Sequence, residues 1–182
     1  MKTVLAAGVA AAALVSAASA DVTVTFTNQT WTGFNFSDLT AAYGGFTGSL
    51  TGVSVNATLN ASVSFTYADD LCVYVDPAPL GTGGLLQVGG FSNLSAAQRY
   101  TWPNGGASAP GTTVIGTVNL TTALAFSGTS ADPIIWLGNG YGASGTSGTW
   151  TGSITLIGVD AVPAPGAIAL LGLAGLAGRR RR

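Results

Sequence analysis

The segment VSVNATLNASVSFTY, residues 53–67, decides the fold class. Its odd-numbered positions are apolar or aromatic and its even-numbered positions are Ser, Thr or Asn, so all fifteen residues alternate. Strict alternation places one face of a β-strand in a core and the other in water. Because fifteen residues are many for one strand, we expect a bend or bulge near Asn60.

The rest of the chain between residues 21 and 162 has the same β character. Further strand candidates, separated by turns rich in Gly, Pro and Asn, are residues 22–27, 71–75, 84–88, 113–120, 123–126, 134–137 and 150–159. Helical periodicity is weak throughout and supports at most one turn, at residues 94–98. This spacing predicts an all-β domain at residues 21–160, an antiparallel β-sandwich or jelly roll of about eight strands.

The N-terminal residues 1–20 are typical of a secretory signal peptide. Lys2 precedes an Ala/Val/Leu run, and Ala18-Ser19-Ala20 matches an A-x-A cleavage site. We expect signal peptidase to cut before Asp21, where strand-like sequence begins. The alternative is a short buried N-terminal helix.

The C-terminal residues 161–182 have three parts. Pro163 and Pro165 interrupt regular structure, residues 166–178 are small or apolar, and four arginines end the chain. As a helix, the apolar run is about 20 Å long, short of the ~30 Å hydrocarbon core. We therefore expect a marginal hydrophobic helix that halts in the inner membrane with its arginines in the cytoplasm.

This layout resembles the PEP-CTERM sorting signals of Gram-negative bacteria. The matching residues are Val162, Pro163, Ala164 and Pro165, then the apolar run and Arg179, Arg180, Arg181 and Arg182. Ala164 stands where the family usually has Glu, so the motif is a VPAP variant. The resemblance implies cleavage by an exosortase-like membrane protease and delivery to the cell surface or beyond. A permanent tail anchor in the periplasm is the alternative.

The composition excludes several functions. Residues 21–162 contain seven Asp and one basic residue, Arg99, which gives a net charge of −6. Without His, Glu or a second cysteine beside Cys72, the chain lacks the residues for a Ser-His-Asp triad or a His/Cys zinc site. A domain this acidic is not expected to bind nucleic acid.

The aspartates are the candidate metal ligands. Asp69, Asp70 and Asp76 flank one expected strand, and their hard oxygen atoms suit Ca²⁺, the one cofactor that the sequence leaves open. The alternative is that the first two cap a turn and the third ends the strand. If extended, Asp69 and Asp70 point to opposite faces, and Asp76 lies ~20 Å away along the strand. Glycoside hydrolysis needs two carboxylates within about 5–10 Å, so we expect no catalytic residues and no enzyme.

Aromatic residues in Gly-rich loops are the candidate carbohydrate ligands. Tyr100, Trp102 and Tyr141 lie in such loops. Trp136 and Trp150 lie on expected strands and are expected in the core, where a large ring buries much apolar surface.

The expected outer faces are rich in hydroxyl groups and poor in charge. Residues 21–162 contain 22 Thr and 13 Ser, and six Asn lie in N-x-S/T sequons: Asn28, Asn35, Asn56, Asn60, Asn93 and Asn119. Glycosylation is one interpretation, and alternation of Asn with Thr on exposed strands is the other.

A second resemblance concerns the middle domain. Asp70-Leu-Cys-Val-Tyr-Val-Asp-Pro77 and Gly148-Thr-Trp150 are similar to motifs of the P domain, a jelly roll that accompanies secreted proteases. Together the patterns predict an exported cell-surface or extracellular-matrix protein with a structural or adhesive role. A module that binds extracellular polysaccharide or calcium is the second hypothesis.

Overall fold

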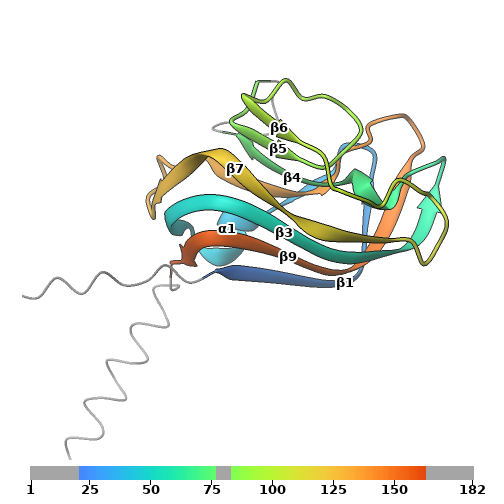
Figure 1. The fold of residues 1–182 in the computed structure, drawn as a ribbon, viewed down its shortest axis with the longest axis horizontal. Helices are drawn as coiled ribbons and strands as arrows, with labels where there is room; N and C mark the ends of the chain where they lie inside the picture. The colour runs from blue at the N-terminus through green and yellow to red at the C-terminus, as the bar shows by residue number, and fades with distance from the viewer. Residues whose placement is uncertain (1–20, 77–82, 163–182) are drawn as a thin grey trace, which may run out of the picture.

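The computed structural model describes residues 21–76 and 83–162, which form two β-sheets packed face to face (Figure 1). The expected all-β sandwich is confirmed. The described residues contain nine strands, close to the expected number.

The first sheet has four antiparallel strands in the order β1-β9-β3-β7. Their bounds are Val22–Thr32 for β1, Ser147–Ala161 for β9, Phe46–Val63 for β3 and Thr113–Ser127 for β7. The two separate strands expected at residues 113–120 and 123–126 are parts of one strand, β7.

The second sheet has five strands in the order β2-β8-β4-β5-β6. Their bounds are Phe36–Asp38 for β2, Ile134–Asn139 for β8, Leu71–Asp76 for β4, Leu86–Val88 for β5 and Gln98–Tyr100 for β6. All pairs are antiparallel except β5 with β6.

Two short helical elements join the strands. The α-helix α1, Leu39–Tyr43, begins where Asp38 accepts a hydrogen bond from the Ala41 N–H (2.7 Å), and it ends at Gly44, which has a left-handed backbone. The 3-10 helix η1 spans Ala68–Asp70. The helical turn expected at residues 94–98 is wrong, because this segment is irregular until β6 begins.

Strand β3 confirms the expected bulge. Its pairing with β9 skips Asn60, between Leu59 and Ala61. Up to Leu59 the apolar positions are buried as predicted, but beyond the bulge Val63 is 50% and Phe65 77% exposed. An extra residue in one strand bends it and ends its regular inward alternation. The prediction that the core face continues to Tyr67 is therefore wrong.

The core lies between the two sheets. All six residues of β4 are buried, and Trp150 of β9 is fully buried as predicted. The Trp150 indole donates a hydrogen bond to the Ala68 carbonyl (3.1 Å) and lies 5.9 Å from Trp31, centroid to centroid. This ring joins η1 to the first sheet.

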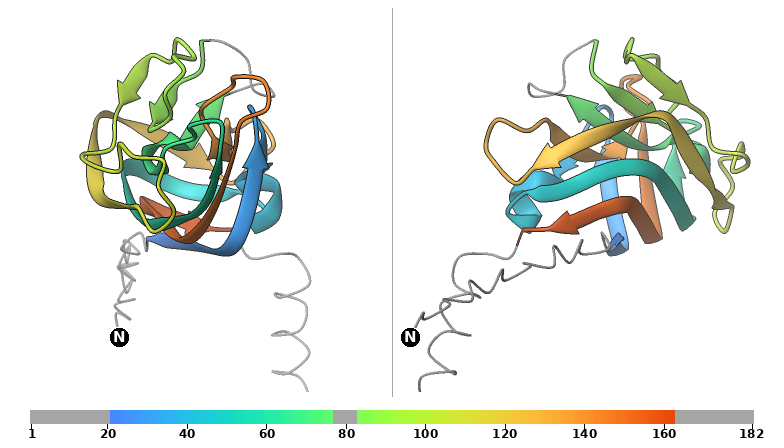
Figure 2. Two further views of the ribbon diagram at one scale, coloured as in Figure 1. Left: turned by 90° about the vertical axis from the view of Figure 1, so that its right-hand side faces the viewer. Right: turned by 60° about the vertical axis from the view of Figure 1, so that its left-hand side comes forward.

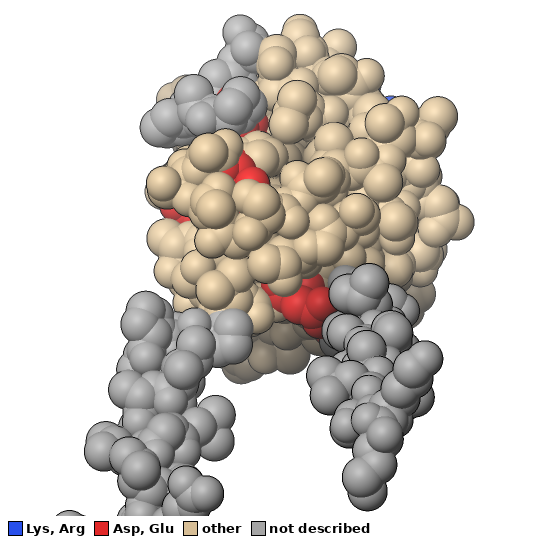
Figure 3. Space-filling model, turned by 90° about the vertical axis from the view of Figure 1, so that its left-hand side faces the viewer, with Lys and Arg blue, Asp and Glu red and all other residues tan. Residues whose placement is uncertain are grey.

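The first and the last described residues lie at the same end of the sandwich (Figure 2). Asp21 accepts a hydrogen bond from the Gly158 N–H, and Val162 donates one to the Gly45 carbonyl (both 3.0 Å). Figure 3 shows this end, where acidic groups are scattered over a mostly uncharged surface. The η1 helix and the turn before it lie toward the other end of β3, where Val63 pairs with Ser147 (Figure 1).

Candidate functional site

A tight turn after β3 displays the first aromatic residues of the site. Ser64 and Phe65 have positive φ angles of 53° and 63°. The turn is closed by hydrogen bonds from Ser62 Oγ to the Thr66 carbonyl (2.7 Å) and from Thr66 Oγ1 to the Val63 carbonyl (3.0 Å). A bulky residue rarely adopts such a φ, and strained backbone of this kind is often found at functional sites.

Asp70 connects this turn to a second loop. Its side chain is 3% exposed, and its Oδ2 accepts a hydrogen bond from the Tyr67 N–H (2.7 Å). Its Oδ1 accepts one from the Phe91 N–H (3.1 Å). The Asp70 carbonyl accepts a third from the Gly140 N–H (2.7 Å). One residue thus fixes the three loops that carry the aromatic side chains.

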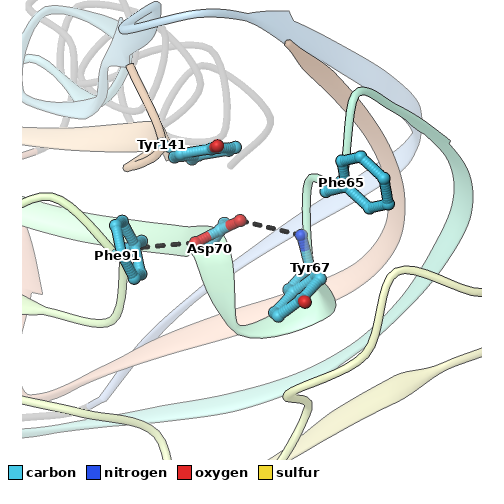
Figure 4. A pocket seen from close by; sticks show the side chains of 5 residues that line it. All are labelled: Phe65, Tyr67, Asp70, Phe91 and Tyr141. Atoms are coloured by element: carbon cyan, nitrogen blue, oxygen red, sulfur yellow. Dashed lines mark hydrogen bonds between the residues drawn. The ribbon is translucent and has the colours of Figure 1, made fainter. Parts of the chain in front are cut away.

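Four aromatic rings and one carboxylate line an open hollow of about 190 Å³, here named the first hollow (Figure 4). Its lining residues are Phe65, Tyr67, Asp70, Phe91 and Tyr141. Phe91 is 73% exposed and meets Tyr141 edge to face, with ring centroids 5.6 Å apart. In Figure 4 the rings surround the Asp70 carboxylate.

A second hollow of about 250 Å³ adjoins the first and shares Tyr67, Asp70 and Phe91 with it. Asp69, Arg99 and Trp102 are among its other lining residues. Arg99 donates a hydrogen bond to the Phe91 carbonyl (3.1 Å). It is the one basic residue in the described part of the chain.

Two glycines allow the loop of Phe91 and the loop of Tyr141 to approach each other closely beside these hollows. Gly90 has a φ of +78°, and a Cβ there would lie 2.9 Å from the Gly140 Cα and 3.3 Å from the Cys72 side chain. Only glycine combines this φ with such an approach at low cost. The two glycines therefore hold the loops of Phe91 and Tyr141 together.

The carboxylates at the site have altered acidity. Burial raises the pKa of Asp70 to about 6, an effect that the hydrogen bonds from Tyr67 and Phe91 reduce and the nearby Asp69 charge increases. Burial also raises the pKa of Asp69. Burial raises the pKa of the Cys72 thiol far above its usual range, so it stays protonated.

Only one of the three aromatic residues predicted to bind carbohydrate lies in the first hollow. Tyr141 lines it, whereas Trp102 is 5% exposed and donates its indole N–H to the Leu71 carbonyl (2.6 Å). Trp102 reaches only the wall of the second hollow. Tyr100 is half-buried, and its hydroxyl is hydrogen-bonded to Gln98 and Thr121. Trp136, expected in the core, is only half-buried.

The predicted calcium ligands are divided between two places. Asp69 and Asp70 lie before β4, and Asp76 lies at its opposite end. Within residues 21–76 and 83–162, no three acidic, His or Cys side chains form a group suited to a metal ion. Asp69 and Asp70 do not lie in an extended segment but in η1, and both line the second hollow.

The six sequon asparagines are all exposed. Two of them contact each other, because the Asn60 amide donates to the Asn28 side-chain oxygen (2.7 Å). The predicted cleavage residues Ala18 and Ala20 and the tail residues Pro163, Ala164, Pro165 and Arg179–Arg182 lie outside the described residues. No helix of the described part is long and apolar enough to span a membrane.

Sequence reasoning missed Phe65, Tyr67 and Phe91 as site residues. Phe91 follows Gly89-Gly90, the same Gly-rich context that singled out Tyr141, so that signal was present. In comparisons with known protein families, curated proteins and solved structures, nothing matched the chain. The function is therefore argued from the site.

Proposed function

We propose that the chain is an exported protein of the cell surface or extracellular matrix that binds saccharide in the first hollow. One observation carries the ligand class: four aromatic side chains, among them Phe65 (77% exposed) and Phe91 (73% exposed), surround a single carboxylate. Exposed apolar clusters commonly mark a binding site. A sugar ring presents C–H groups to aromatic faces and hydroxyls to a carboxylate.

The strand orders support a finer description of the fold. Strands β1, β9, β3 and β7 form one sheet, and β2, β8, β4 and β5 begin the other, so successive strands mostly alternate between sheets. Two interleaved Greek keys give this order, which supports a jelly roll with β6 added at one edge. Jelly rolls are common among lectin domains, so the architecture suits the proposed binding.

The position of the site suits display at a surface. The described chain enters and leaves at one end, while the exposed Phe65 lies beyond the far end of β3. A tether through the C-terminal tail would leave the first hollow facing away from the membrane. We propose that signal peptidase removes residues 1–20 and that an exosortase-like protease cuts near residues 163–165 after transient insertion in the inner membrane.

The export proposal predicts a defined mature protein. The full chain is produced in a Gram-negative host that has an exosortase, and intact mass is measured separately for culture supernatant and envelope. We expect loss of residues 1–20 and of everything after about Pro163–Pro165 in the released form. Added hexose mass would support glycosylation. An intact tail on all the protein would refute sorting and favour a permanent anchor.

Removing either exposed ring is expected to weaken saccharide binding about tenfold, which corresponds to about 1.4 kcal/mol. The variants are Phe65→Ala and Phe91→Ala, and binding is measured by affinity electrophoresis in gels containing cellulose derivatives, chitosan or xylan. The matched control is Ile115→Ala, which removes a 51% exposed apolar side chain of β7 outside both hollows.

Retention by at least one polysaccharide, lost in both ring variants and kept in the control, would support the proposal. Equal retention of all four proteins would refute it. Because we expect no enzyme, the bound oligosaccharide should be recovered with its chain length unchanged.

A further inference from the structure

The first hollow combines aromatic faces with a carboxylate and has no basic residue in its described lining. Each Asp70 oxygen accepts one backbone N–H, at 2.7 Å and 3.1 Å. A carboxylate has about four acceptor sites, so Asp70 keeps acceptor capacity after these two bonds. A buried negative charge with spare acceptors and no cationic partner is stabilised by a ligand that brings a positive charge.

The aromatic rings favour the same kind of ligand. The π-faces of Phe and Tyr attract cations within about 6 Å, more strongly when the site is shielded from water. Phe65, Tyr67, Phe91 and Tyr141 line the hollow around the carboxylate (Figure 4). An ammonium group has three donors on a compact charge, which suits the spare acceptors of Asp70.

The one cation of the described chain lies outside the first hollow. Arg99 lines only the second hollow, where Asp69 is also found. Its guanidinium donates to the Phe91 carbonyl, which leaves other N–H groups for a ligand. The charged groups of the two adjoining hollows therefore differ. The first hollow has only the Asp70 carboxylate, and the second adds the Asp69 carboxylate and the Arg99 guanidinium.

We propose that the first hollow selects a sugar unit with a protonated amino group, held between the aromatic rings and Asp70. The hydroxyls of the neighbouring unit then lie in the second hollow between Asp69 and Arg99. The ligand class is thus an amino-sugar polymer with free amino groups, and this inference rests on the proposed saccharide binding. Uronic or sulfated sugars are disfavoured, because the two adjoining hollows hold two carboxylates against one guanidinium.

Isothermal titration calorimetry with three oligosaccharides of equal length tests the selection. The probes are a β-1,4-linked glucosamine oligomer, its N-acetylated form and a cello-oligosaccharide, at about pH 6.5 and low salt. We expect the glucosamine oligomer to bind about tenfold more tightly than the other two. Added salt should reduce this preference, since screening weakens only the charged contact.

Two carboxylate variants locate the selecting group. Asp70→Asn is expected to abolish the preference for the amino sugar. Asp69→Asn is expected to weaken the binding of all three probes alike and so to keep most of the preference, because Asp69 lines the second hollow and not the first. Since Asp70→Asn also removes an acceptor for a backbone N–H, its folding is checked by circular dichroism. The salt dependence of the unmodified protein gives an independent measure of the charged contact.

The outcomes separate the two proposals. Equal affinity for all three probes would overturn the amino-sugar inference and leave saccharide binding intact. An amino-sugar preference that survives in folded Asp70→Asn, or that is insensitive to salt, would also overturn the inference. No binding of any probe, together with no retention by any polysaccharide, would overturn both proposals.

Discussion

Replacing Trp150 with alanine is expected to lower the free energy of unfolding by about 3–5 kcal/mol. The ring is fully buried between the sheets and packs 5.9 Å from Trp31. Its loss leaves a cavity that the rigid strands on either side can fill only in part, which adds to the lost burial. The substitution also leaves the Ala68 carbonyl without its indole donor.

Urea-induced unfolding followed by circular dichroism measures this effect on the mature protein. Trp150→Phe keeps a ring and loses mainly the hydrogen bond, so a smaller loss of about 1–2 kcal/mol is expected. Ile115→Ala, at an exposed position, should change the free energy of unfolding by less than about 0.5 kcal/mol. A loss below about 1 kcal/mol in Trp150→Ala would contradict the role given to this ring in the core.

Trp150 also shows what the sequence predicts well. The alternating pattern of residues 53–59 gave the inward face of β3, and the length of the pattern gave the bulge at Asn60. Both follow from local geometry, because side chains of a strand alternate and a long strand must bend. Burial of Trp150 was expected for another reason, the large apolar area of its ring, and this prediction is confirmed. The same reasoning placed Trp136 in the core, although it is only half-buried.

Phe65 shows where the pattern ceases to be informative. Alternation continues through Phe65 and Tyr67, yet β3 ends at Val63, where its register with β9 ends at Ser147. The end of a strand depends on its partner, which lies 84 positions away and is not encoded locally. Ser64 and Phe65 form a left-handed turn instead, and the Phe65 ring, expected in the core, is 77% exposed.

Trp102 shows the opposite error. A Gly-rich loop suggested an exposed ring, but a Cβ at Gly89 would overlap the Trp102 indole, so the glycine provides space for burial of the ring. A glycine near an aromatic residue in the sequence can therefore indicate either a loop that exposes the ring or a close contact that buries it. Only the tertiary packing distinguishes Phe91, which is exposed, from Trp102, which is buried.

Lowering the pH from about 7 to about 4 is expected to raise the free energy of unfolding through Asp70, by roughly 2 kcal/mol. Burial raises the folded-state pKa of this carboxyl to about 6 from an ordinary value of 3.8. At pH values between these two pKa values, the folded state binds more protons than the unfolded state. Stability attributable to Asp70 is therefore highest below pH 3.8 and decreases as pH rises through about 6.

Two other carboxyl groups set the limits of the pH window. Asp69 contributes in the same direction, because burial also raises its pKa. Burial alone would raise the pKa of half-buried Asp132, but hydrogen bonds from Ser127, Thr129 and Gly128 lower it, so this group contributes in the opposite direction. Its contribution is lost only as the pH falls below about 4, so the interval from about pH 4 to pH 7 isolates the buried carboxylates.

Urea unfolding at several pH values compares the unmodified protein with Asp70→Asn. The variant is expected to lose most of the dependence on pH, whereas Asp69→Asn should keep the larger part. A stability that falls steadily from pH 7 to pH 4 in the unmodified protein would contradict the raised pKa of Asp70.

Protonation of Asp70 is expected to lower the affinity for the proposed amino sugar, although it raises the free energy of unfolding. Protonation of Asp70 below about pH 6 removes the negative charge that would attract an ammonium group. Acidification should therefore weaken amino-sugar binding while it stabilises the fold. If acid weakened binding by unfolding the protein, affinity and stability would decrease together. A decrease in affinity with an increase in stability would therefore assign the lost binding to the charge of Asp70.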